Sequence, residues 1–272
     1  MKLKSFFVFL LSFSMVHLCV SSLQFKQEEL AKRGFWEEYL KKAKIIKSEK
    51  VGEGITKPRK IYMDLDGKKA VGVWKNPSGV EKGFKEGWQY EIAAYRMDKL
   101  LELDMVPPTV ERTHRLRKGS LQLWVPGLMS ELDRQKKNIP VPEDKKEYRL
   151  KMLTLARAFD SLIANVDRTQ QNICYTEDWR LILIDHSRSF RKKRIYTEQL
   201  IYGKYGLRKR PFGKLPREFV EKVRQLTFDK IRKAVGDTLT FSEVNAVLAR
   251  QKLFLKEIDE MIKKKGEQEV LY

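Results

Sequence analysis

Residues 155 to 190 read LARAFDSLIANVDRTQQNICYTEDWRLILIDHSRSF, and this stretch decides the fold. An apolar segment with helical spacing leads to Asp167, Asn172 follows five residues later, and Asp185 closes the second of two strand-like segments. Phosphoryl transfer from ATP requires one carboxylate to orient the attacking hydroxyl, then an amide and a second carboxylate to hold Mg²⁺. The order therefore predicts a kinase-like fold, with Asp167 as the catalytic residue and Asn172 and Asp185 as metal ligands.

Four upstream residues complete the expected nucleotide site. Lys75 ends a predicted strand, where its ammonium can reach the α- and β-phosphates of ATP, and Glu91 on the next predicted helix can hold Lys75 in place. Gly52 and Gly54 lie in the first predicted hairpin, where bare backbone amides can approach phosphate oxygens. Taken singly, these residues also fit a surface lysine, a helix-face glutamate and a plain turn. Their order ahead of Asp167 favours the nucleotide site.

The chain before Pro126 has the pattern of a small antiparallel sheet with one helix. Asp66-Gly67 is a strong hairpin signal between two of its strands. A helix is predicted over residues 88–102, before Pro107 and Pro108. The first predicted strand starts at residues 45–46, and the others lie at 61–65, at 70–75, around Val110 and at 121–125.

The rest of the chain is mostly helical by the same reading. Helices are predicted at 146–164, 217–226 and 241–263, and short strands at 173–175 and 181–184. The sequence therefore predicts an α+β, two-lobed, kinase-like fold with the chemistry in the cleft between the lobes. Its expected parts are a signal peptide (1–22), an N-terminal helix (23–42), a small lobe (43–125) and a large lobe (126–272).

The amino terminus predicts export. Lys2 and Lys4 precede an uncharged, largely apolar run over residues 5–20, and Ser21 and Ser22 follow it, which is typical of a secretory signal peptide. The run is shorter than the roughly 20 apolar residues needed to span a bilayer, so an uncleaved membrane anchor is the less favoured alternative. We expect a periplasmic or secreted protein.

The net charge indicates which partners the chain can bind, and the cysteine content indicates whether it can form a disulfide. The formal charge is +20, and +18 once Lys2 and Lys4 leave with the signal. Such a charge favours acidic substrates, lipid head groups and nucleic acid alike. Nucleic acid is not the partner we expect, because binding to it would not explain the order of the motifs. Cys174 is the one cysteine outside the signal, so no intramolecular disulfide is expected.

The motifs NVDRTQQN (165–172) and LILIDHSRSF (181–190) resemble those of atypical kinases: HipA-like kinases, phosphoinositide kinases and secretory-pathway kinases related to Golgi casein kinase. VGEGITKP (51–58), AVGVWK (70–75) and the Glu91 helix support the resemblance, which covers roughly residues 44 to 272. It implies ATP and Mg²⁺ as cofactors and a nucleotide loop that includes Thr56. It also implies a hinge at residues 122–125, where Trp124 and Val125 wall the adenine pocket.

Two positions depart from that family pattern. Thr169 stands where many members carry histidine after the Asp-Arg pair, and His186-Ser187 follows Asp185 in place of Phe-Gly. The switch mechanism of ordinary protein kinases is therefore not expected. For Arg168, an ion pair inside the loop is favoured over contact with a phosphate. For His186, a hydrogen bond within the loop is favoured over a role as a titrating group.

Three classes of function remain open from the sequence. The first is an active kinase that transfers phosphate to a hydroxyl of a protein, lipid or small-molecule acceptor. The second is a pseudokinase that binds nucleotide without transfer, and the third is a basic binding module. The scattered His17, His114 and His186 do not form a zinc-site pattern.

Overall fold

The structure is a computed structural model, which describes residues 27–52, 58–81 and 83–272. The predicted signal peptide lies outside this part and stays a prediction, which sequencing the amino terminus of the chain recovered from its source would test. Among the described residues, we find no helix whose length and hydropathy would let it cross a membrane.

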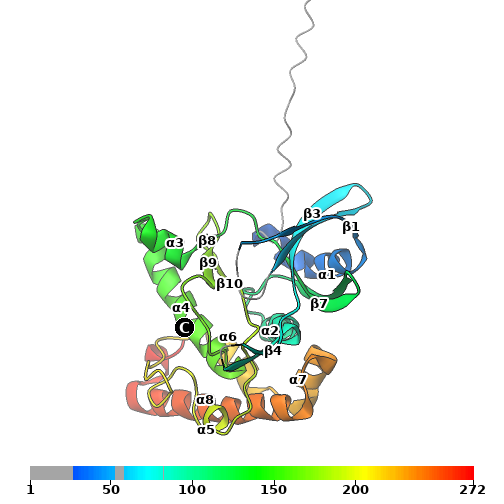
Figure 1. Ribbon diagram of the computed structural model, residues 1–272. Helices are drawn as coiled ribbons and strands as arrows, with labels where there is room; N and C mark the ends of the chain where they lie inside the picture. Colours follow the sequence, from blue (N-terminus) through cyan, green and yellow to red (C-terminus); the bar gives the residue numbers. More distant parts are fainter. Residues whose placement is uncertain (1–26, 53–57, 82) are drawn as a thin grey trace, which may run out of the picture.

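The small lobe is built on a five-stranded antiparallel sheet, drawn in blue to green in Figure 1. Its strands, in spatial order, are β1 (Lys44–Lys50), β2 (Arg59–Leu65), β3 (Lys68–Lys75), β7 (Arg117–Leu123) and β6 (Thr109–His114). Asp66 and Gly67 turn the chain between β2 and β3 with φ of 53° and 81°, the left-handed conformations that such a two-residue turn requires. The predicted strands are confirmed, with β6 longer than expected.

The N-terminal helix packs against this sheet. Its described part is a 3-10 turn (Gln27–Lys32) followed by α1 (Arg33–Lys42). Trp36, Tyr39 and Leu40 are buried on its inner side, as their spacing predicts, and the Tyr39 hydroxyl donates to the Met63 carbonyl of β2 at 3.0 Å. This contact fixes the helix to the side of the sheet where Met63 and Ile61 form the core.

Helix α2 (Trp88–Leu101) carries Glu91 and joins the two lobes. It contacts β6 and β7 of the small lobe, yet many of its apolar side chains belong to the core of the large lobe and it lies against α7 (Phe228–Val235). Ahead of it is a hairpin that the sequence did not predict, β4 (Ser78–Glu81) and β5 (Phe84–Gly87). The hairpin reaches the large lobe, because the Gly87 N–H donates to the Ser187 carbonyl.

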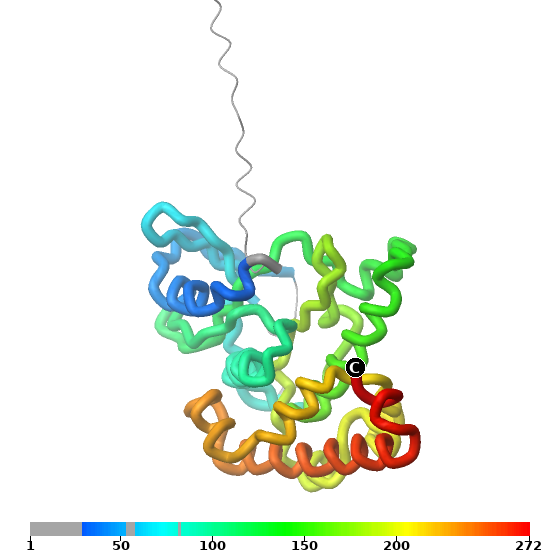
Figure 2. The backbone as a smooth tube through the Cα atoms, turned by 180° about the vertical axis from the view of Figure 1, so that it is seen from behind, coloured from blue at the N-terminus to red at the C-terminus, as the bar shows by residue number. Residues whose placement is uncertain are grey.

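The large lobe is mainly helical, as predicted. Its long helix α8 runs along the base of the molecule, on the opposite side from the five-stranded sheet (Figures 1 and 2). Thr240 and Glu243 form a capping box that starts α8. The helices of the large lobe are α3 (Glu131–Lys136), α4 (Glu143–Ile163), α5 (Ile195–Glu198), α6 (Arg217–Arg224), α7 and α8 (Phe241–Lys265).

A small three-stranded sheet lies beside the cleft. It consists of β10 (Leu181–Leu183), β9 (Ile173–Tyr175) and β8 (Met129–Ser130), all antiparallel. Helix α4 ends at Ala164, which adopts a left-handed φ of 48°, and the chain then enters the loop that carries Asp167. Strands β9 and β10 follow, and Asp185 comes two residues after the end of β10, so this sheet sets the spacing of the predicted site.

Candidate active site

Three charged residues from different elements meet between the lobes. The Lys75 ammonium at the end of β3 lies 2.9 Å from Glu91 Oε1 on α2 and 3.1 Å from Asp185 Oδ1 after β10. The Lys75 and Glu91 side chains are 14% and 2% exposed, whereas that of Asp185 is 32% exposed. The structure therefore brings together the lysine, its glutamate partner and one predicted metal ligand, and the aspartate is the member that faces solvent.

The ionisation of this triad follows from its contacts. Burial opposes charge on Asp185, yet the ammonium of Lys75 outweighs it and lowers the pKa of Asp185 to about 2. Burial also opposes charge on Lys75, and the two carboxylates outweigh it and raise the pKa of Lys75. Burial raises the pKa of Glu91, which the Lys75 ammonium counteracts. Asp185 is thus ionised at neutral pH, as a metal ligand must be.

His186 lies behind the triad, fully buried. Its backbone N–H donates to Glu91 Oε2 at 2.9 Å. His186 therefore helps to hold Glu91 in position, and Glu91 in turn holds Lys75. Burial lowers the pKa of His186 well below its usual value, and Arg168 adds to this effect. The Arg168 guanidinium lies 2.8 Å from His186 Nε2, a hydrogen bond that agrees with the favoured interpretation of this residue.

Beneath the site is a buried polar cluster that we call the loop anchor: Asp160, Asn165, Arg168 and His186. The buried guanidinium of Arg168 donates to both carboxylate oxygens of Asp160 at 2.9 Å and approaches His186 Nε2 at 2.8 Å. It also donates to the carbonyls of Asn172 and Ile184, at 2.9 and 2.7 Å. A structural ion pair of Arg168 is therefore confirmed, but its partner Asp160 lies on helix α4 and not inside the loop as expected. The bonds to the two carbonyls tie the Asp167 loop to the segment that precedes Asp185.

Asp167 stands at the edge of this loop, with its side chain 39% exposed. Its N–H donates to Asn165 Oδ1 at 3.1 Å. This contact forms an Asx turn, in which the chain leaves the direction of helix α4. Its Oδ2 accepts from Arg188 Nη1 at 3.1 Å, and Arg188 Nε donates to Glu86 Oε1 of the β4–β5 hairpin at 2.7 Å. We call this chain of Glu86, Arg188 and Asp167 the hairpin clamp.

The sequence analysis missed both partners in the clamp. Arg188 follows Asp185 by three positions, and the sequence places it only within the motif of residues 181–190. Glu86 comes from the hairpin that was not predicted and is 6% exposed. No local sequence pattern indicates which cation pairs with Asp167.

The two expected metal ligands are adjacent and chemically suited to Mg²⁺. The Ile184 N–H donates to the Asn172 carbonyl at 3.2 Å, which puts Asn172 beside the residue that precedes Asp185. Asn172 Nδ2 donates to the Asp167 carbonyl at 3.3 Å, so the amide oxygen is turned away from this contact. An amide and a carboxylate oxygen fit Mg²⁺, which takes its remaining ligands from phosphates and water. Within the described ranges no cluster of three or more His, Cys, Asp or Glu forms an all-protein metal site.

A cavity of about 460 Å³ opens beside the triad, between the sheet and the large lobe. Val73 and Ile184 supply apolar walls, Trp124 and Val125 line it as predicted, and Lys75 lies at one end. The backbone N–H of Trp124 already donates to the Val71 carbonyl at 2.9 Å. An adenine bound in this cavity would therefore hydrogen-bond with a backbone group other than the Trp124 N–H.

The predicted glycine loop is only partly described. Gly52 is exposed and has φ of 54°, a left-handed conformation, and the Val51 N–H to Pro58 carbonyl bond closes the base of its hairpin. Gly54 and Thr56 lie outside the described residues, so their contact with phosphate stays a prediction.

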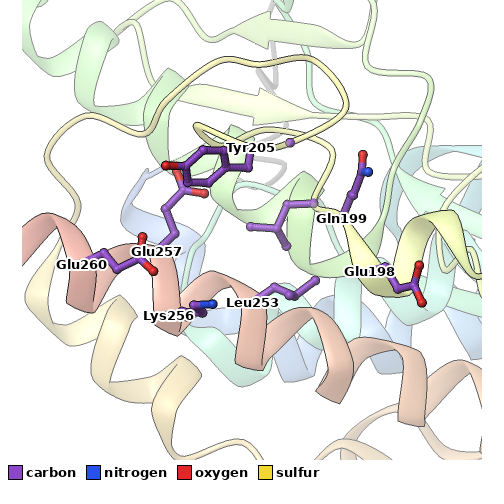
Figure 3. A pocket seen from close by; sticks show the side chains of 9 residues that line it. Glu198, Gln199, Tyr205, Leu253, Lys256, Glu257 and Glu260 are labelled. Atoms are coloured by element: carbon purple, nitrogen blue, oxygen red, sulfur yellow. The ribbon is translucent and has the colours of Figure 1, made fainter.

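A second cavity, of about 200 Å³, lies within the large lobe between α8 and residues 198–206 (Figure 3). Tyr205, Glu257 and Glu260 gather at one end of it. Glu257 Oε1 accepts the Lys204 N–H at 2.7 Å, so this carboxylate holds the neighbouring loop. The cavity shares no lining residue with the cleft, and it adds no group to the predicted chemistry.

Comparison with known proteins supports the fold. No family model matches the chain, and no curated protein does. The solved structure of the proinflammatory kinase CtkA from Helicobacter pylori is similar, with a TM-score of 0.53 and 11% sequence identity over 84% of this chain and 97% of that chain. At this identity the likeness shows the fold alone. The chain has the two-lobed, kinase-like α+β fold that the sequence predicts.

Proposed function

We propose that the chain is an ATP- and Mg²⁺-dependent phosphotransferase that acts on a hydroxyl group of its acceptor. The observation that carries the proposal is the triad, because Lys75, Glu91 and Asp185 come from three elements and meet within 3.1 Å beside a cavity large enough for a nucleotide. A surface lysine would not be buried against two carboxylates. The kinase-like fold supports the same class of function.

Each residue has a defined task in this proposal. Lys75, held by Glu91, binds the α- and β-phosphates, and Asn172 and Asp185 hold Mg²⁺, which neutralises charge on the transferring phosphate when it is bound. Asp167 accepts the proton of the acceptor hydroxyl and aligns its oxygen. Arg188 occupies Asp167 Oδ2, which leaves Oδ1 to face the hydroxyl. The acceptor is a protein, lipid or small molecule.

The first experiment measures the thermal stability of the chain with ATP and Mg²⁺, together and separately. A site filled at a hundredfold excess over its dissociation constant stabilises the fold by about 2.7 kcal/mol. Asp185→Asn should abolish the metal-dependent part of this shift, because it removes the charge while asparagine tolerates the φ of 60° at this position. Asp178→Asn, an exposed carboxylate in the β9–β10 turn, is the matched control and should keep the whole shift.

The same variants separate transfer from binding. Asp167→Asn should keep the nucleotide shift, whereas phosphate transfer from labelled ATP to the chain itself and to water should fall by about 10² to 10⁴-fold. If Asp167→Asn retains full transfer, the role given to Asp167 is wrong. A nucleotide shift with no transfer in the wild type would identify a pseudokinase, and no shift with any nucleotide would reject the nucleotide site.

A further inference from the structure

A basic cavity of about 270 Å³ lies between the β4–β5 hairpin and residues 190–196. It shares no lining residue with the nucleotide cleft. Among the residues that the structure describes, Glu243 is the one acidic residue that lines it. The cationic side chains there are Lys85, Arg191, Lys192 and Lys193. This concentration of one sign of charge around a small hollow favours an anionic occupant.

Glu243 balances only one of the four positive charges, and neutral donors of the scaffold hold its carboxylate in place. Oε1 accepts from the Tyr90 hydroxyl at 2.7 Å, and Oε2 accepts from the Thr240 N–H at 2.8 Å as part of the α8 capping box. The Lys85 ammonium is 4.0 Å from Oε1, at the limit of an ion pair. The cavity therefore keeps a surplus of positive charge.

Arg191 shows the clearest need for a partner. Its Nε donates to the Arg188 carbonyl at 3.1 Å, but its Nη2 is buried and has no hydrogen-bond acceptor in the described part of the chain. Burial also lowers the pKa of Arg191. A buried guanidinium N–H without an acceptor is unfavourable, and a carboxylate or phosphate oxygen would satisfy it.

The cavity lies next to the proposed site of transfer. The Phe84 ring lines it and is covered by two guanidinium groups, that of Arg188 at 5.2 Å and that of Arg191 at 5.8 Å. Arg188 is also the residue that binds Asp167. One aromatic ring and one arginine thus connect the basic cavity with the carboxylate that would receive the acceptor hydroxyl.

We propose that this cavity is the subsite for an oxyanion, a carboxylate or a phosphate group, carried by the acceptor. That an acceptor carries the oxyanion rests on the proposed phosphotransferase function. That the cavity binds an oxyanion rests on the cavity alone. Because Arg188 stands between the cavity and Asp167, the oxyanion belongs to a group separate from the one that bears the hydroxyl. Phe84 and Val80, 41% and 72% exposed, present an apolar surface to whatever joins the two groups.

Binding of two probes, inorganic phosphate and a tetraglutamate peptide, tests the proposal by calorimetry in the absence of nucleotide. Arg191→Gln and Lys193→Gln should each weaken binding, Arg191→Gln by about tenfold, because hydrogen bonds to charged groups contribute roughly 1.5–3 kcal/mol. Lys193 is exposed, so its variant keeps the fold if Arg191→Gln does not. Arg194→Gln removes the same charge from the same basic run. Its side chain is 88% exposed and paired with Glu198 outside the cavity, so binding should stay within twofold.

The outcomes separate the two proposals. Saturable binding that weakens in the two cavity variants and not in Arg194→Gln supports the subsite, and preference for one probe tells whether the acceptor group is a phosphate or a carboxylate. Equal weakening in all three variants would show attraction by net charge and would overturn the subsite, as would an absence of saturable binding of either probe. Binding lost in Lys75→Met but kept in Arg191→Gln would place the anion in the nucleotide cleft and also overturn it. Since no nucleotide is present, failure of phosphate transfer does not change these results.

Discussion

Arg168 and Arg188 each bind an aspartate beside the candidate site, but the loop anchor and the hairpin clamp are built differently. The Arg168 side chain is 3% exposed and its partner Asp160 is fully buried, and the pair is surrounded by carbonyls and His186. In the clamp, the Arg188 side chain is 13% exposed and Asp167 is 39% exposed. The anchor therefore sets the position of the loop, while the clamp leaves its aspartate within reach of a substrate.

This difference indicates that the anchor serves mainly the stability of the fold, whereas the clamp serves mainly the proposed chemistry. A buried ion pair with all its donors satisfied depends on both partners, because removing one leaves an uncompensated charge away from water. A pair with an exposed carboxylate is screened by solvent and contributes less. We expect substitutions in the anchor to unfold the large lobe, and substitutions in the clamp to act mainly on the acceptor side of the site.

The largest effect is expected for Arg168→Met. It leaves Asp160 buried without its countercharge and frees two carbonyls, so the free energy of unfolding should fall by about 3–5 kcal/mol. Arg194→Met, which breaks an exposed pair with Glu198, should lower it by less than about 1 kcal/mol. Urea unfolding gives both values. A loss below about 1 kcal/mol in Arg168→Met would remove the distinction between anchor and clamp.

Glu131, at the start of α3, lies between these two extremes. Its side chain is 7% exposed like those in the anchor, but its partners Arg134 and Arg149 are 17% and 23% exposed. Burial opposes its charge, yet hydrogen bonds from Arg134, Gln135 and Arg149 outweigh burial and lower the pKa of Glu131 to about 2. A carboxylate with a lowered pKa binds fewer protons in the folded state, so its stabilisation is present above the ordinary pKa and is lost as the pH falls.

Glu131→Gln should therefore lower the free energy of unfolding by about 2 kcal/mol at pH 7, a value reduced for solvent screening. The difference from wild type should stay constant down to pH 4.5 and shrink between pH 4.5 and 2. Urea unfolding in steps of pH measures it. Glu143→Gln, whose side chain is 86% exposed, is the control and should show no such window. A difference that persists unchanged to low pH would assign the effect to packing.

The triad was largely predictable from the sequence, whereas the clamp and the Asp160 partner in the anchor were not. Lys75 and Glu91 each stand in a recognisable local pattern, the end of a strand and the face of a helix, so their order was enough to pair them. Glu86 and Arg188 are 102 positions apart, and the strands SGVE and FKEG that carry the hairpin are too short and polar to show alternation. Contacts of this kind depend on tertiary packing that no local pattern encodes.

The smallest effect, and the closest test of the comparison, is the coupling between Glu86 and Arg188. A double-mutant cycle with Glu86→Gln and Arg188→Gln isolates the energy of this contact from the separate effects of each substitution. We expect a coupling of about 1 kcal/mol from urea unfolding, because Arg188 remains partly hydrated and keeps Asp167 as a second partner. A coupling of about 3 kcal/mol or more would mean that the clamp is as structural as the anchor. In that case the hairpin would be a fixed part of the large lobe, and Asp167 would owe its position to Glu86 as much as to Asn165.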